Sequence, residues 1–108
     1  MSDTLTSEIV VPANHPSLAG HFPGHPVVPA VVLLDAVLAA IRVRGDLVLR
    51  SIPSVRFLQP LLPDERVELR IQFTALEAAQ LRARFQGVRA TALVFEGSFI
   101  LSTPRPFP

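Results

Sequence analysis

Residues 20–37 of the chain read GHFPGHPVVPAVVLLDAV, and this stretch decides the fold. His21 stands in a turn rich in glycine and proline, and Asp35 interrupts an apolar run fourteen residues later. Five prolines in residues 12–29 exclude a helix or a central strand there and predict a long, stiff loop. A base on a stiff loop and an acid on an apolar helix indicate proton transfer in a dry pocket.

An α-helix is predicted over residues 29–44, where the proline-rich loop gives way to a continuous apolar pattern. Pro29 suits the first helical position, and Gly45 suits the position just after the last turn. The first three turns are apolar on every side except at Asp35, so we expect a buried central helix. Apolar surroundings favour the neutral, proton-donating form of a carboxyl group.

The rest of the chain has the pattern of β-structure. Residues 67–73 alternate between apolar and polar side chains, as a half-buried strand does. Residues 75–85 contain good helix formers, but their flanks are strands, so we interpret them as part of a hairpin. Further strands are predicted at residues 4–11, 52–58, 81–86 and 89–101, the last with Gly97 as a bulge.

These elements predict one α+β domain over residues 1–108, an antiparallel sheet wrapped around one helix, with irregular tails at residues 1–3 and 102–108. A chain of 108 residues leaves much of its surface exposed on folding, and 49% of this chain is hydrophobic. We therefore expect it to bury more surface by dimerisation.

Composition excludes several classes of function. The net charge of +1 argues against nucleic acid as a partner. All ten basic residues are arginine and there is no cysteine, which excludes Schiff-base lysine chemistry, thiol nucleophiles and cysteine-ligated zinc. The sequence has no secretory signal and no apolar run long enough to cross a bilayer, so we expect a cytoplasmic protein without membrane insertion.

At residues 21–36, HFPGHPVVPAVVLLDA resembles the signature of the hot-dog-fold 3-hydroxyacyl-[acyl carrier protein] dehydratases. In that family a His-Phe-x-Gly turn precedes a central helix that carries an acid fourteen residues after the histidine. A second stretch, RFLQPLLPDERVEL at residues 56–69, resembles the strand-turn-strand motif of the same family. The likeness covers about residues 9–101 and is greatest to the small dehydratases of bacterial aryl-polyene pigment clusters.

The resemblance implies a role for each matching residue. His21 is implied as the general base and Asp35 as the general acid in removing water from a 3-hydroxyacyl thioester. Backbone N–H groups at Gly24 and Ala30 are implied to bind the thioester oxygen. Phe22 is placed with this substrate-binding group, although packing is the simpler interpretation of its ring. The implied partner is an acyl carrier protein, whose pantetheine arm carries the substrate, and no other cofactor is needed.

The family's histidine and acid come from different subunits, so the resemblance implies a homodimer or a heterodimer of hot-dog chains. Two positions depart from the family pattern. Ala30 replaces a glycine at the start of the helix, where its methyl group crowds the thioester. Ala39 replaces a glutamine that often follows the acid by four residues, so the amide that could position the acid in the family is missing here.

Several alternatives stay open. A hot-dog thioesterase would use a carboxylate to activate water, and a non-catalytic subunit would pair with an active relative. Isomerisation to a cis-3-enoyl product is also compatible with Asp35. A metal site is disfavoured, because His15, His21 and His25 lie in a proline-rich loop. Some of the arginines would meet the acidic carrier protein or its phosphate, but a solvated strand face accounts for most of them: Arg56, Arg66, Arg82, Arg84 and Arg89.

Overall fold

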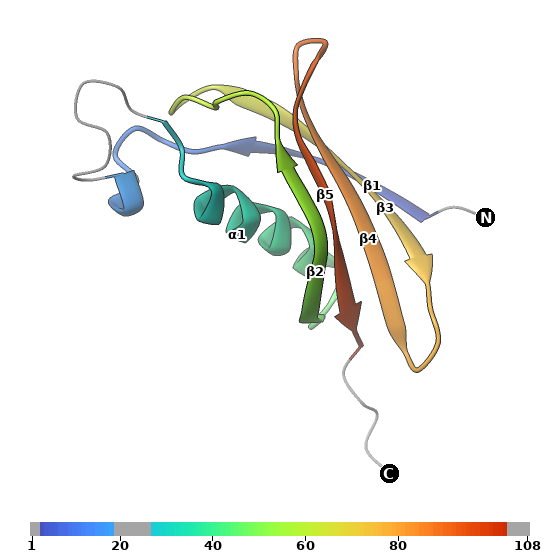
Figure 1. The fold of residues 1–108 in the computed structure, drawn as a ribbon. Coiled ribbons are helices and arrows are strands. Elements are labelled where there is room, and N and C mark those ends of the chain that lie inside the picture. Colours follow the sequence, from blue (N-terminus) through green and yellow to red (C-terminus); the bar gives the residue numbers. More distant parts are fainter. Residues whose placement is uncertain (1–2, 19–26, 104–108) are drawn as a thin grey trace.

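The computed structural model describes residues 3–18 and 27–103. One α-helix, α1 (Ala30–Ile41), lies along one face of a five-stranded sheet (Figure 1). The strands are β1 (Asp3–Val10), β2 (Val48–Phe57), β3 (Arg66–Ala75), β4 (Gln80–Arg89) and β5 (Ala92–Ser102). Two short 3-10 helices, η1 (Pro16–Leu18) and η2 (Arg42–Arg44), complete the described elements.

The sheet has the order β1-β3-β4-β5-β2, and every neighbouring pair is antiparallel. This confirms the predicted α+β class, an antiparallel sheet wrapped around one helix. Strands β1 and β5 reach one residue further into the predicted tails than expected, to Asp3 and Ser102. Strand β2 begins at Val48, four residues before the predicted strand, because its first residues pair with the end of β5.

The core lies between α1 and the sheet. Helix residues Val32, Leu33, Val37 and Ile41 are buried against the inward residues of the strands. In β3, inward and outward residues alternate strictly, as the sequence predicted. The remaining side of α1 is exposed, so the prediction of a fully buried helix is wrong for the single chain. A helix on one side of one sheet can bury only one face.

The ends of α1 differ slightly from the prediction. Pro29 is the N-cap residue, with extended backbone, and not the first residue of the helix. The helix tightens into η2 over its last three predicted residues, and Gly45 follows with φ +140°. This left-handed backbone is the conformation that a glycine after the last turn allows.

The stretch at residues 75–85 is a hairpin, as predicted, in spite of its helix-forming residues. Its turn places Ala78 and Ala79 at φ +58° and +57°, and the amide of Leu76 donates to the carbonyl of Gln80 at 2.8 Å. Eight paired positions between β3 and β4 hold the two arms together. Cross-strand pairing therefore overrides the local helix propensity.

Phenylalanine rings fill the sheet side of the core, and two glycines make room for them. Phe85 faces Gly97 across β4 and β5, and Phe95 faces Gly87. The rings of Phe85 and Phe95 are 6.1 Å apart, and a Cβ atom at Gly87 would overlap the ring of Phe95. Gly97 keeps regular pairing with both of its neighbouring strands, so the predicted bulge there is wrong.

The irregularities of the sheet lie elsewhere. They fall between Gly87 and Val88 in the β4–β5 pair and at two points of β2 between Leu49 and Ser54. The predicted strand at residues 89–101 is divided, because Arg89 ends β4 and β5 begins at Ala92 after a turn. None of the described helices is long and apolar enough to cross a membrane.

The contact between Gly87 and Phe95 predicts a loss of stability on substitution. Gly87→Ala would force the buried ring of Phe95 to move, which we expect to lower the free energy of unfolding by about 1–3 kcal/mol. Chemical denaturation of the variant measures this. Gln86→Ala, at the neighbouring exposed position, is the matched control and should change stability by less than about 0.5 kcal/mol. Equal stability of the two variants would contradict the packing argument.

Candidate active site

The predicted site residues fall into two groups. His21, Phe22 and Gly24 lie outside the described residues, as does His25. Asp35 and Ala30 are described, and both lie on α1. The roles that the sequence assigns to all five site residues remain predictions.

Asp35 lies in the second turn of α1, on an exposed side of the helix. Its side chain is exposed, in contrast to the apolar burial that the sequence predicted. The helical period explains this position, because residues one turn apart lie on the same side of a helix. Val31 and Ala39, one turn before and after Asp35, are exposed with it, and 64% of the surface of Val31 is accessible to solvent. The acid therefore lies on an apolar face that the single chain leaves uncovered.

Asp35 nevertheless lines a pocket of about 300 Å³. The end of β1 and the loop after it form one wall, and α1 forms the other. Its lining residues are Val10, Val11, Pro12, His15, Val32, Asp35 and Ala36. His15, which the sequence suggested only as an unlikely metal ligand, thus shares a pocket with the predicted acid.

Ala30 lines a second pocket, of about 320 Å³, at the first turn of α1. Phe57 and Leu58 at the end of β2 and Leu33 of α1 give this pocket apolar walls. The first amide of the helix to make a backbone hydrogen bond is that of Val32, which donates to the carbonyl of Pro29. The N–H groups of Ala30 and Val31 come before it in the chain and find no acceptor among the described residues. An apolar cavity edged by backbone donors that lack an acceptor in the described part of the chain can hold an acyl thioester and polarise its carbonyl oxygen.

Hydrogen bonds from three directions hold the chain segment that forms the outer wall of this second pocket. The amides of Leu58 and Gln59 both donate to the carbonyl of Val94 in β5, at 2.8 and 3.2 Å. The amide of Val28 donates to the carbonyl of Leu61 at 2.8 Å. The β2–β3 connection is therefore tied to the sheet on one side and to the start of the helix on the other.

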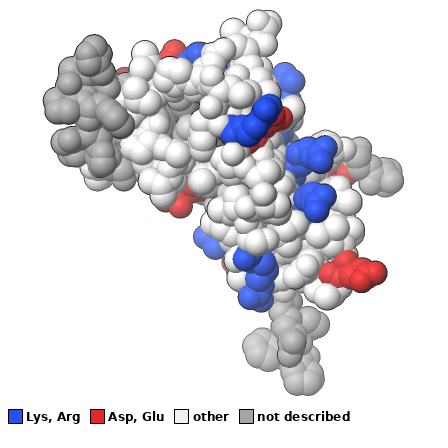
Figure 2. All heavy atoms as spheres, in the orientation of Figure 1, with Lys and Arg blue, Asp and Glu red and all other residues white. Residues whose placement is uncertain are grey.

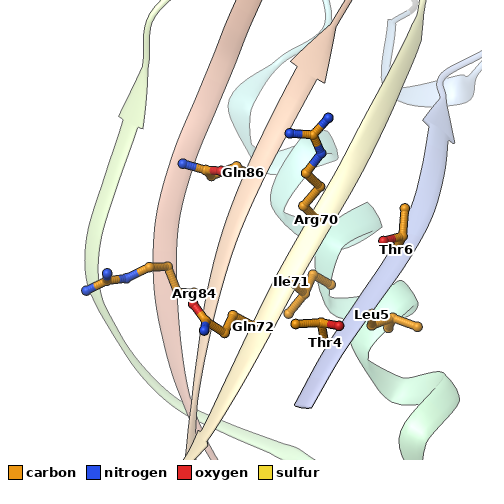
Figure 3. Close-up of a pocket in the computed structure, with 8 residues that line it drawn as sticks. All are labelled: Thr4, Leu5, Thr6, Arg70, Ile71, Gln72, Arg84 and Gln86. Atoms are coloured by element: carbon orange, nitrogen blue, oxygen red, sulfur yellow. The ribbon is translucent and has the colours of Figure 1, made fainter. Parts of the chain in front are cut away.

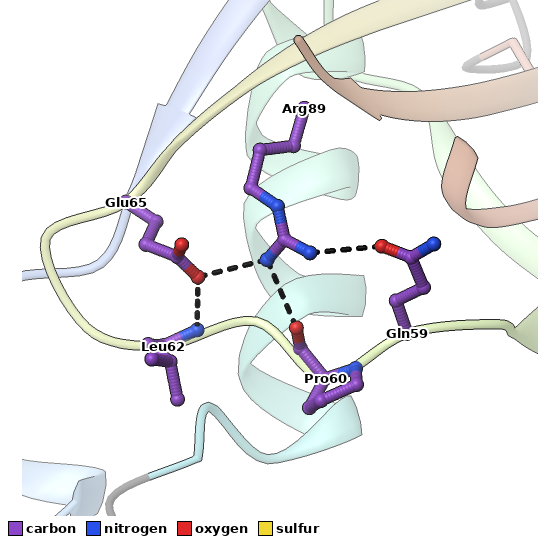
Figure 4. A network of polar contacts seen from close by, with 5 residues as sticks. All are labelled: Gln59, Pro60, Leu62, Glu65 and Arg89. Atoms are coloured by element: carbon purple, nitrogen blue, oxygen red, sulfur yellow. Dashed lines mark hydrogen bonds and ion pairs between the residues drawn. The ribbon is translucent and has the colours of Figure 1, made fainter. Parts of the chain in front are cut away.

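Arg89, at the end of β4, makes the third attachment (Figure 4). Its guanidinium donates to the side-chain oxygen of Gln59 at 2.8 Å, to the carbonyl of Pro60 at 3.0 Å and to the carboxylate of Glu65 at 2.8 Å. Glu65 in turn accepts from the amide of Leu62 at 2.8 Å. The sequence suggested for Arg89 either partner binding or a place on a solvated strand face, and it could not show these contacts because the residues involved are 24 to 30 positions away.

The other arginines that the sequence suggested lie in varied surroundings. Arg56 pairs with Glu96 and Arg66 pairs with Glu8, while Arg82 and Arg84 have no ion pair within the described part of the chain. Figure 2 shows arginines spread over one face of the molecule with carboxylates among them, and no single basic patch. This distribution agrees with a solvated strand face.

Arg84 lines a pocket of about 550 Å³ on the outer face of the sheet, the face away from α1 (Figure 3). Arg70, Arg84, Gln72 and Gln86 occupy the outward positions of β3 and β4 there, beside Thr4 and Thr6 of β1. Neither Asp35 nor Ala30 lines this pocket. It is therefore separate from the predicted site.

A metal centre is not formed by the residues that the structure describes. Over residues 3–18 and 27–103, no three histidine, cysteine, aspartate or glutamate side chains gather closely enough to hold an ion. The pocket of Asp35 contains one histidine and one carboxylate among apolar groups. This combination suits proton transfer better than metal binding.

Comparison with solved structures identifies the fold. The dehydratase heterocomplex ApeI:P from Xenorhabdus doucetiae contains a chain that superposes with a TM-score of 0.74 at 20% identity, with 95% of each chain covered. The (R)-hydratase from A. caviae involved in PHA biosynthesis gives a TM-score of 0.79 at 14% identity, covering 95% of this chain and 96% of the other. Thioesterases share the fold as well. The architecture is that of a hot-dog protein.

Sequence comparison defines the family within that fold. The 3-hydroxyacyl-[acyl-carrier-protein] dehydratase FabZ of Myxococcus xanthus is 32% identical over 107 residues, covering 89% of this chain and 70% of the relative. The family model described as ApeI-like, ApeI dehydratase, matches residues 1–97. The chain belongs to the ApeI-like dehydratase family.

The contacts of Arg89 predict a local loss of stability when they are removed. Arg89→Met keeps an unbranched apolar side chain but removes the guanidinium, and with it the hydrogen bonds to all three acceptors. We expect the free energy of unfolding to fall by about 1–3 kcal/mol. Amide hydrogen exchange should also quicken at Leu62, whose acceptor Glu65 loses its partner.

Arg82→Met, at an exposed position of the same strand, is the matched control for Arg89→Met. It should change the stability by less than about 0.5 kcal/mol and leave exchange at Leu62 unaltered. Unchanged exchange at Leu62 in Arg89→Met would show that Arg89 does not hold the β2–β3 connection.

Proposed function

We propose that this protein dehydrates 3-hydroxyacyl thioesters carried on an acyl carrier protein to trans-2-enoyl thioesters, in fatty-acid or aryl-polyene-type biosynthesis in the cytoplasm. The observation that carries the proposal is the family match over residues 1–97, which spans both His21 and Asp35. The Myxococcus relative, named for this reaction on acyl carrier protein, supports the substrate class.

The proposed reaction is an elimination that moves only protons and water. The imidazole of His21 takes a proton from C2, and the carboxyl group of Asp35 gives a proton to the C3 hydroxyl. The C3–O bond breaks, water leaves, and the electron pair of the C2–H bond forms the C2=C3 double bond. No electron is transferred to or from the substrate, so the reaction requires no redox cofactor.

The pocket at Ala30 is proposed to receive the thioester. Negative charge develops on the thioester oxygen as the C2 proton leaves. The N–H groups of Ala30 and Val31, which have no acceptor among the described residues, can stabilise it. Gly24 is proposed to add a further backbone donor, and Phe22 to pack against the bound group. The apolar walls formed by Leu33, Phe57 and Leu58 suit the acyl chain.

The active assembly is proposed to contain a second hot-dog chain, either a copy of this one or a relative. Asp35 lies on an exposed apolar face of α1, beside Val31. Strand β2 is an edge of the sheet and exposes Val48 and Ile52. An exposed edge strand and an exposed apolar helix face are both features of protein interfaces. The partner would supply the histidine turn that faces Asp35.

Substitution of the two proposed catalytic residues tests the reaction. Hydration of a trans-2-enoyl-acyl carrier protein, followed by loss of enoyl absorbance, should fall by about 10²–10⁴-fold in His21→Ala and in Asp35→Asn. Asp46→Asn, an equivalent change at another exposed aspartate, should leave the rate unaltered. Size-exclusion chromatography with light scattering checks that all variants keep the assembly of the wild type.

Two outcomes would overturn the proposed reaction, and a third would decide which second chain completes the active assembly. Full activity in both variants would remove His21 and Asp35 from the chemistry. Release of free acid from an acyl thioester, without hydration, would identify a thioesterase. No turnover by this chain alone, but turnover after addition of a hot-dog relative, would identify a subunit of a heterocomplex.

Mixing two inactive variants tests whether the site is shared between subunits. If His21 and Asp35 of different copies form one site, a mixed dimer of His21→Ala and Asp35→Asn contains one intact pair. Activity should therefore return when the two variants are unfolded together and refolded, and not when either is treated alone. No recovery in dimers shown by mass spectrometry to be mixed would place both residues of a site in one chain.

A further inference from the structure

Asp35 has no polar neighbour on its own helix that could orient its side chain. The residues one turn away on α1 are Val31, Val32, Leu38 and Ala39, all of them apolar. No hydrogen bond to the carboxylate of Asp35 occurs among the described residues. A general acid needs a fixed direction relative to the leaving group, because proton transfer depends on geometry before it depends on acidity.

The pocket that begins at Asp35 holds one other polar side chain, that of His15. Its remaining lining residues are apolar: Val10, Val11, Pro12, Val32 and Ala36. An imidazole N–H is a good donor to a carboxylate, and apolar walls strengthen such a bond by excluding competing water. Two groups with complementary chemistry therefore face the same volume of about 300 Å³.

The backbone holds His15 in a tight turn. The amide of His15 donates to the carbonyl of Pro12 at 3.0 Å, and the amide of Leu18 donates to the carbonyl of His15 at 3.0 Å. Asp64 anchors the start of the same segment, since its side chain accepts from the amide of Ala13 at 3.2 Å and its amide donates to Val11 at 2.8 Å. A histidine on such a turn can orient a neighbouring side chain, because hydrogen bonds restrain its backbone.

We propose that His15 is a positioning residue that donates a hydrogen bond to the carboxyl group of Asp35 and holds it in the direction needed for protonating the C3 hydroxyl. The function of this contact rests on the proposed dehydration, whereas its existence does not. His15 would thereby supply the polar contact that Ala39, the residue one turn after Asp35, cannot make.

Three variants test the role in catalysis. His15→Phe keeps a ring in the pocket but has no donor, and we expect kcat to fall about tenfold, the equivalent of one hydrogen bond, with KM within about twofold. His15→Gln keeps an N–H donor and should recover most of that loss. Asn14→Ala, at the exposed neighbouring position, is the matched control and should behave as wild type.

The contact itself is tested without turnover. The ring nitrogen resonances of His15 should shift when Asp35 is replaced by asparagine, which exchanges the carboxyl group for an amide. They should not shift in Asp46→Asn, which removes an exposed aspartate of the loop after η2. The carboxyl carbon of Asp35 should shift in return in His15→Phe and remain unaltered in Asn14→Ala.

The kinetic and the spectroscopic experiments together separate the failure of the positioning role from the failure of the proposed dehydration. Inactive wild-type protein with coupled resonances would reject the dehydratase reaction and keep the His15–Asp35 contact. Active wild-type protein without coupled resonances, or with full activity in His15→Phe, would overturn the positioning role. A rise in KM at unchanged kcat would reassign His15 to substrate binding and also overturn it.

Discussion

A single helix that is apolar on nearly every side cannot bury all of them against one sheet. In this protein α1 buries Val32, Leu33, Val37 and Ile41 and leaves Val31, Asp35 and Ala39 exposed. The uncovered face is where the predicted acid lies. The same geometric constraint therefore determines the packing of the core, the position of Asp35 and the need for a second chain in the proposed mechanism.

The sheet supports this helix because its inner surface is tightly filled. Two phenylalanines, Phe85 and Phe95, each lie across from a glycine of the neighbouring strand, where the missing Cβ atom leaves room for the ring. Such filling leaves little room inside the single chain for an acyl group. The cavity that can accept one opens instead at the first turn of α1, between the helix and the β2–β3 connection.

That connection links the two halves of the proposed site. On one side it forms the wall of the pocket at Ala30, where Arg89 and the carbonyl of Val94 hold it. On the other side Asp64 binds the loop that carries His15 into the pocket of Asp35. A short segment without regular structure is thus held by β4 and β5 on one side and binds the loop after β1 on the other.

The sequence by itself determined the local elements and the kind of chemistry. Alternating side chains in residues 67–73, the proline-rich loop and the apolar run around Asp35 were sufficient to predict an antiparallel sheet on one helix, which the structure confirms. They also predicted a histidine–acid pair, which stays a prediction. These features depend on residues that are close along the chain. Backbone preferences and the spacing of apolar side chains therefore predict them without knowledge of the tertiary structure.

Only the tertiary structure decided which face of α1 is buried, where the sheet is irregular and which residues share a pocket. Gly97 suggested a bulge in the sequence, but it accommodates the ring of Phe85 from another strand. Arg89 and His15 acquired their places through contacts with residues distant in the chain. Packing between residues far apart in the sequence determines such contacts. The pattern of adjacent residues therefore cannot predict them.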